Sequence, residues 1–140
     1  MATEFFAMSG DIKGESQDDK HKDEIEIVRW SWGMSHDSSP LAGGGGASGK
    51  ARFADFVFTH AFDKASPVLM KTCVTGEHIK AVTITGRKAG QNPKDYLVVT
   101  LSDVIITSVT PSGSPEDSGT AETVSLQYAK VDVDYKAQKP

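Results

Sequence analysis

The chain has 140 residues, of which 38% are hydrophobic and 24% charged, a composition ordinary for one globular domain. A formal net charge of −4 excludes a strongly basic surface for nucleic acid or anionic lipid. Cys73 is the only cysteine, so no internal disulfide can form, and no apolar run approaches the roughly 18 residues of a membrane-spanning helix. We therefore expect a single domain over residues 1–140, without a nucleic-acid partner and without membrane insertion. The N-terminus has neither a basic segment nor an apolar stretch, so we expect synthesis in the cytoplasm without a cleavable signal peptide.

The N-terminal region predicts a strand, a polar connection and a second strand. Residues 4–12 form a plausible first strand, with Phe6 and Met8 on one face. Residues 13–23 are polar and of mixed charge, which predicts a solvated loop. Residues 24–32 predict a strand that holds both tryptophans of the chain.

Three predicted strands change the face on which their apolar side chains recur: residues 24–32, 96–109 and 122–135. Because side chains alternate between the two faces of a strand, such a change means a bulge or a strand buried on each side in turn. Strongly coiled strands that close a small barrel show this pattern, whereas a flat open sheet does not. The changes fall between Ile27 and Val28, between Leu101 and Val104, and between Tyr128 and Val131.

A long loop, residues 34–51, follows the tryptophans and contains four consecutive glycines. Residues 44–50 match the spacing of a phosphate-binding loop, G-x-x-x-x-G-K. However, Ala51 replaces the hydroxyl residue that would hold magnesium, and residues 52–62 predict a strand where a helix should follow. We therefore interpret this segment as a flexible loop of low bulk and expect no nucleotide cofactor.

The central region predicts a strand over residues 52–62 and one helix over residues 66–74. Ser66 suits the N-cap, Pro67 the first helical position, and Gly76 a left-handed C-terminal cap. The predicted strand places four side chains on one face: Phe56, Phe58, His60 and Phe62. The predicted helix places three on one face: Leu69, Met70 and Cys73.

The C-terminal half predicts only strands and turns. Strands are expected over residues 78–85, 96–109 and 122–135, with a turn at residues 86–94 and a polar loop at residues 111–119. The fold class is therefore mainly β, a barrel of about six to seven strands with one short helix.

No arrangement of residues predicts catalysis or metal binding. The four histidines do not pair with one another or with cysteine at ligand spacing, and His60 on an apolar strand suits a core or an interface. Cys73 on the inner helix face suits inert packing. Because no nucleophile elbow or protease-like motif is present, we expect no enzyme, no metal and no cofactor.

The order of several short motifs resembles the Hcp family, the hemolysin-coregulated proteins that form the tube of the bacterial type VI secretion system. The motifs are DIKGES from Asp11, HKDEIEIVRWSWGMS from His21, the glycine run before Gly49 and Lys50, SPVLMKTC from Ser66, ITGRKAG from Ile84 and VDVDYKAQK from Val131. The resemblance covers essentially the whole chain.

The resemblance implies a two-sheet β-barrel with a flanking helix, six copies of which form a ring. Rings would stack into a hollow tube that lies inside a contractile sheath, carries the spike protein VgrG at its tip and is exported with effector proteins in its lumen. Residues 34–51 would then form an arm that contacts a neighbouring subunit or ring, with glycines that allow close backbone approach. The expected ring-stacking residues in this arm are Ser38, Gly43, Gly44, Gly45, Gly46 and Ser48.

Arg29 and Ser31 are the candidate lumen residues, because Ser31 lies between Trp30 and Trp32 and must point to the opposite face. Packing of Ser31 at a subunit seam is the alternative. Two other functions remain open from the sequence: an oligomeric β-barrel that binds a small ligand or carbohydrate, and a small hydrolase.

Overall fold

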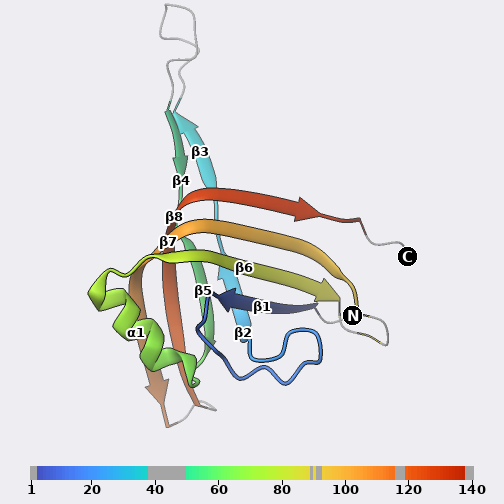
Figure 1. The fold of residues 1–140 in the computed structure, drawn as a ribbon, viewed down its shortest axis with the longest axis vertical. Helices are drawn as coiled ribbons and strands as arrows, with labels where there is room; N and C mark the ends of the chain where they lie inside the picture. The colour runs from blue at the N-terminus through green and yellow to red at the C-terminus, as the bar shows by residue number, and fades with distance from the viewer. Residues whose placement is uncertain (1–2, 38–49, 89, 91–92, 116–118, 138–140) are drawn as a thin grey trace, which may run out of the picture.

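The computed structural model describes residues 3–37, 50–88, 90, 93–115 and 119–137, and shows a closed β-barrel with one helix and a projecting two-stranded ribbon (Figure 1). The order of strands around the barrel is β1-β2-β5-β8-β7-β6, with every neighbouring pair antiparallel. The ribbon consists of β3 and β4. The elements are β1 (Thr3–Ser9), β2 (Ile25–Ser31), β3 (Met34–Asp37), β4 (Lys50–Phe53), β5 (Phe56–Ala61), α1 (Ala65–Thr75), β6 (Ile79–Lys88), β7 (Asp95–Ser114) and β8 (Gly119–Tyr135).

The two longest strands, β7 and β8, turn a corner together, which divides the barrel into two sheets (Figure 1). Their register is continuous across the corner, since Leu101 pairs with Val131 and Val104 pairs with Tyr128. Between these two pairs the inward face changes on both strands at once, and Asp103 adopts a positive φ of 55°. The predicted change of face in both strands is confirmed, and a bend at a barrel corner is its cause.

The predicted change of face in β2 is also confirmed, and there it is a bulge. The register against β5 shifts between Ile27 and Arg29. Ile27 is buried, whereas Val28 and Arg29 are both exposed, so two successive side chains leave the barrel on its outer side. Trp30 then turns inward and stacks on Phe56, with ring centroids 5.5 Å apart.

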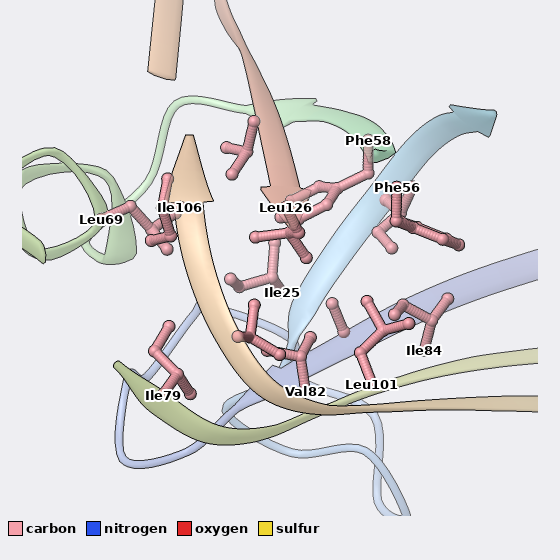
Figure 2. Close-up of a cluster of buried hydrophobic side chains, with 14 of the residues drawn as sticks. Ile25, Phe56, Phe58, Leu69, Ile79, Val82, Ile84, Leu101, Ile106 and Leu126 are labelled. Atoms are coloured by element: carbon pink, nitrogen blue, oxygen red, sulfur yellow. The ribbon is translucent and has the colours of Figure 1, made fainter. Parts of the chain in front are cut away.

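The barrel interior is filled by aliphatic and aromatic side chains from both sheets and from the helix (Figure 2). Full burial of one Leu, Ile or Phe side chain contributes roughly 1.5–3 kcal/mol, so this cluster is the main stabilising term of the fold. Phe56, Phe58 and His60 share the buried face of β5 as predicted, but Phe62 lies beyond the end of the strand and is 41% exposed. The side chains labelled in Figure 2 are Ile25, Phe56, Phe58, Leu69, Ile79, Val82, Ile84, Leu101, Ile106 and Leu126.

Helix α1 begins one residue earlier than predicted and is capped differently. The N-cap residue is Lys64, which makes no side-chain capping hydrogen bond, and Asp63 Oδ1 just before it accepts a hydrogen bond of 2.9 Å from the Ala65 N–H. Ser66, the predicted N-cap, lies within the first turn, and its Oγ accepts a hydrogen bond of 3.1 Å from the Asp63 N–H. Gly76 adopts φ 69° and forms the predicted left-handed cap. Leu69 buries the inner face of the helix in the core, and Cys73 packs against it.

Three segments predicted as loops or turns contain strand. Strand β6 continues through Gly86 to Lys88, and β7 and β8 continue beyond the barrel as a hairpin that includes Pro111 and Gly113. Pro111 and Gly113 are tolerated there because this part of β7 is an edge strand that pairs on one side only, with β8. Residues 34–37 and 50–53 form the ribbon at the base of the predicted loop.

The connection over residues 13–23 is a loop, as predicted, but it is only partly solvated, because Gly14, Ser16 and His21 are buried and the loop is anchored to the barrel. Arg87 is only 5% exposed and donates two hydrogen bonds to Glu4 Oε2, at 2.9 and 2.7 Å. Its guanidinium also donates to both carboxylate oxygens of Asp18 in this connection. These hydrogen bonds raise the pKa of Arg87 above its ordinary value and hold the pKa of Asp18 below its ordinary 3.8.

An aromatic stack reinforces this anchor. The ring of His21 stacks on Phe6 with centroids 4.5 Å apart, and the Arg87 guanidinium lies 5.0 Å from the same Phe6 ring. The His21 ring nitrogens lie 2.9 Å from Glu24 and 3.2 Å from Asp95. Phe6 and Met8 do share a face, but it is the outer face of the barrel, where Phe6 is covered by this connection and Met8 is half exposed.

A buried polar pair joins the barrel wall to the start of α1. His60 and Glu122 are register partners on β5 and β8, both fully buried, with His60 Nε2 2.8 Å from Glu122 Oε1. On its other side, His60 Nδ1 lies 3.7 Å from Asp63 Oδ2. Burial raises the pKa of Asp63, and the charge of His60 opposes that rise. His60 is therefore a core histidine, one of the two places predicted for it.

We predict that Asp18 stabilises the fold above about pH 4 and loses this effect in acid. Because the pKa of Asp18 is lower in the folded state than its ordinary 3.8, the stabilisation is complete above that value and is lost as the pH falls through the folded-state pKa. Asp18→Asn should therefore lower the free energy of unfolding near pH 7, and the difference from the parent should shrink towards pH 3.

Urea unfolding at a fixed protein concentration measures this difference at each pH. Asp19→Asn is the matched control, because it removes the same charge from an exposed neighbour and should stay within about 0.5 kcal/mol of the parent. A deficit in Asp18→Asn that is unchanged at pH 3 would contradict the prediction.

Candidate functional site

The candidate lumen residues lie on the outer face of one four-stranded sheet, in the order β2-β5-β8-β7. Ser31 is exposed, whereas Trp30 and Trp32 on either side of it pack against the core, so the predicted opposition of their faces is confirmed. Arg29 is exposed on the same outer side as Ser31. Side chains alternate regularly between the two faces from Arg29 onward, because the bulge ends at Val28.

The face around Ser31 and Arg29 is lined mainly by hydroxyl groups. In the register, Arg29 pairs with Thr59, which pairs with Thr123, which pairs with Thr110. The hydroxyls of Thr59 and Thr123 lie 3.1 Å apart and form a cross-strand hydrogen bond. The next row continues from Ser31 through Val57 to Ser125. Apart from Arg29, this surface presents mainly hydroxyl groups and little charge.

Both outer edges of this sheet lack a strand partner among the described residues. On β2, pairing with β1 ends at Ile27, so residues 28–31 are paired only with β5. On β7, pairing with β6 ends at Val104, so residues 105–113 have a strand partner only in β8. Unpaired N–H and C=O groups along a strand edge are sites where another chain can add a strand. A third such edge, on residues 127–135 of β8, belongs to the other sheet.

Two aromatic side chains behind this face, Trp32 and Tyr128, form hydrogen bonds that hold the sheet against the base of the ribbon. The indole N–H of Trp32 donates to the Tyr128 hydroxyl at 2.5 Å, and that hydroxyl donates to the Ala54 carbonyl at 2.9 Å. Trp32 lies between β2 and β3, and Ala54 between β4 and β5. These bonds therefore tie the base of the ribbon to the corner of β8.

The ribbon of β3 and β4 projects from the barrel, and all eight of its residues are exposed (Figure 1). Met34 pairs with Phe53 on one face, and both side chains are more than half exposed. On the other face Arg52 donates to Asp37 at 2.6 Å. The predicted stacking residues, from Ser38 to Ser48, lie outside the described residues.

The structure brings none of the histidines into a metal site. Within the described ranges, no group of three or more His, Cys, Asp or Glu side chains is arranged to hold a metal ion. His21 and His60 are buried in the contacts given above, and His78 pairs with Asp103 at 2.8 Å on the surface. A strand rather than a helix follows Gly49, as expected, but the single strand predicted over residues 52–62 is two strands, β4 and β5, separated at residues 54–55. None of the helices described here has the length and apolar character to cross a membrane.

Sequence reasoning missed the exposed apolar pair Val28 and Phe62. Both were predicted to point inward, but Val28 is 68% exposed and Phe62 41% exposed. The change of face between Ile27 and Val28 signalled a bulge, but the side to which a bulge directs its extra residue depends on the strand that pairs with it.

Comparison with known proteins places this fold in a family. Residues 5–135 match the family model described as "Type VI secretion system effector, Hcp". The chain is 44% identical over 140 residues to the protein hcp1 of Pseudomonas aeruginosa, an alignment that covers 99% of this chain and 86% of the relative.

Solved structures agree with the sequence match. Hcp1 from Salmonella typhimurium is 37% identical, with a TM-score of 0.82 and coverage of 100% of this chain and 90% of the other. A type VI secretion system effector from Yersinia pestis is 35% identical, with a TM-score of 0.80 and coverage of 96% and 91%. The chain therefore belongs to the Hcp family, the tube subunits of the type VI secretion system.

Proposed function

We propose that six copies of this chain close into a ring whose channel is lined by the sheet β2-β5-β8-β7, and that such rings stack into the secretion tube. The observation that carries this proposal is the pair of strand edges without a second strand partner, residues 28–31 and 105–113, on opposite sides of one sheet.

Two different edges on one sheet suit a closed ring. A ring of identical subunits needs a heterologous contact, in which one patch of each copy meets a different patch of the next. If the β7 edge of one copy pairs with the β2 edge of its neighbour, the sheet continues from copy to copy, and backbone hydrogen bonds fix the geometry. In this arrangement no copy keeps an open edge on that sheet, which removes a site of aggregation.

The hydroxyl-rich outer face would then become the channel wall. Ser31 and Arg29 would contact effector proteins carried in the lumen, with the rows of Thr and Ser as a neutral polar lining. The protein would act by assembly and transport rather than by turning over a substrate. Its partners would be its own copies, the VgrG spike, the contractile sheath and the effectors, and it would leave the cytoplasm through the secretion machine itself.

The projecting ribbon would mediate contacts between rings. An isolated two-stranded ribbon is only marginally stable in water, and this one exposes Met34 and Phe53 side by side. Contact with another subunit would cover this apolar pair. The segment between the two strands would reach the neighbouring ring through the glycines and through Ser38 and Ser48.

Hydrogen exchange tests the proposed seam. Amide protons of residues 105–113 and 28–31 should exchange more slowly in the assembled ring than in dissociated subunits, because new backbone hydrogen bonds form along both edges. Residues 97–102 of β7 are the internal control, since they already have strand partners on both sides and should change little. Rings whose only new protection falls on residues 127–135 of β8 would show that the seam lies elsewhere.

Deletion of residues 38–48 tests the stacking role. The shortened chain should keep its fold and its ring, because the barrel strands and both proposed seam edges are untouched. It should form fewer and shorter tubes, as counted by electron microscopy at equal protein concentration. A control deletion of residues 138–140 at the C-terminus should leave tube length unchanged. Tubes as long as those of the parent would refute the stacking role.

A further inference from the structure

We propose that the face of the chain that carries Ser31 also holds a docking groove for an extended segment of cargo protein that presents an apolar side chain beside a carboxylate. This inference rests on the proposed function, because it places the groove on the channel wall. The groove has a volume of about 640 Å³, within the range of about 300–1,000 Å³ typical of ligand sites. It lies between the bulge of β2 and the hairpin end of β7 and β8, and the residues that carry the argument are Val28, Arg29, Phe62, Gly113 and Gly119.

The bulge of β2 makes one wall of the groove. In a regular strand Val28 and Arg29 would point to opposite faces. The shift in register between Ile27 and Arg29 instead leaves both side chains exposed on the outer side. Bulges commonly redirect side chains at functional positions. Here the bulge sets an apolar group directly beside a cation.

The same wall carries a second apolar anchor. Phe62 follows β5, and its N–H donates to the Thr120 carbonyl at 2.8 Å, which fixes its backbone to the start of β8. Its ring is nevertheless 41% exposed, and Val28 in the same groove is 68% exposed. Exposed apolar side chains that line one concave surface are typical of interaction sites rather than of random surface.

The opposite wall is low and consists of small residues. A Cβ added at Gly113 would lie 3.2 Å from Thr120 Oγ1, a tight contact that requires the Thr120 side chain to shift. Gly119 has a φ of 139°, which other residues rarely adopt. Small residues on this wall leave the backbone accessible, which suits an extended main chain as the occupant.

The charge of the groove selects the occupant. Among the described residues, Arg29 forms no ion pair, and no acidic side chain lines the groove. An arginine without a partner, beside two apolar anchors, is complementary to a carboxylate that lies next to an apolar side chain. We therefore assign the groove to an acidic and apolar segment of a carried protein.

Two short peptides test the groove directly. Acetyl-Leu-Asp-Leu-amide and acetyl-Leu-Asn-Leu-amide differ only in the charge that Arg29 would recognise. Nuclear magnetic resonance titration of the purified protein should show the aspartate peptide binding roughly tenfold more tightly, as expected for one charge-assisted contact. Shifted signals should include Val28 and Phe62.

Variants separate recognition by the groove from non-specific attraction. Arg29→Gln should abolish the preference for the aspartate peptide, and Val28→Thr should weaken both peptides about equally. Lys80→Gln, which removes a positive charge from an exposed position of β6 outside the groove, should behave as the parent. Equal binding of the two peptides to the parent, or an unchanged preference in Arg29→Gln, would overturn the proposal, as would failure of both peptides to bind at millimolar concentration.

The assembly state is recorded in the same samples by light scattering. If the parent protein forms rings but binds neither peptide, the groove proposal fails and the proposed ring stands. Peptide binding by a chain that remains a monomer would support the groove and count against the proposed ring.

Discussion

The structure depends on one constraint: β7 and β8 must turn a barrel corner together without losing the hydrogen bonds between them. Each strand has one buried face before the corner and the other face buried after it. Asp103 accommodates the bend with a positive φ, while Leu101 and Val104 remain in the core on either side. The corner allows two sheets to share one apolar interior, which supplies most of the stabilising free energy.

The corner also creates the surfaces that function requires. Beyond it, β7 leaves β6, and an edge of the four-stranded sheet is exposed. On the opposite side, the bulge of β2 ends its pairing with β1 and exposes a second edge. The irregular positions are therefore the ones that leave the two edges open for the proposed assembly.

Much of the barrel could be predicted from the sequence, because its signals are local. The three changes of apolar face lie within single strands, and Gly76 marks the helix end next to the residues that it caps. The opposition of Ser31 to the tryptophans follows from alternation alone. The expectation of rings and tubes came only from the resemblance to the Hcp family, because no local sequence pattern specifies how copies of a chain assemble.

The features that sequence reasoning missed depend on partners far away in the chain. Arg87 binds Asp18 from 69 positions away in the chain. The sequence of residues 13–23 alone gives no sign of this contact, so the segment was predicted to be a solvated loop. The outward direction of Val28 depends on its pairing with β5, and Phe62 is exposed because the strand ends one residue earlier. Pro111 and Gly113 predict a loop by composition, but they lie on an edge of β7 that pairs only with β8, where proline and glycine are tolerated.

The central claim is that this protein acts by assembling copies of itself around an open channel. Native mass spectrometry combined with negative-stain images of the purified chain tests it most directly. The account predicts particles with the mass of six chains and an annular outline with an open centre. A species that keeps the mass of one chain over a wide range of concentration, with no annular particles, would contradict it.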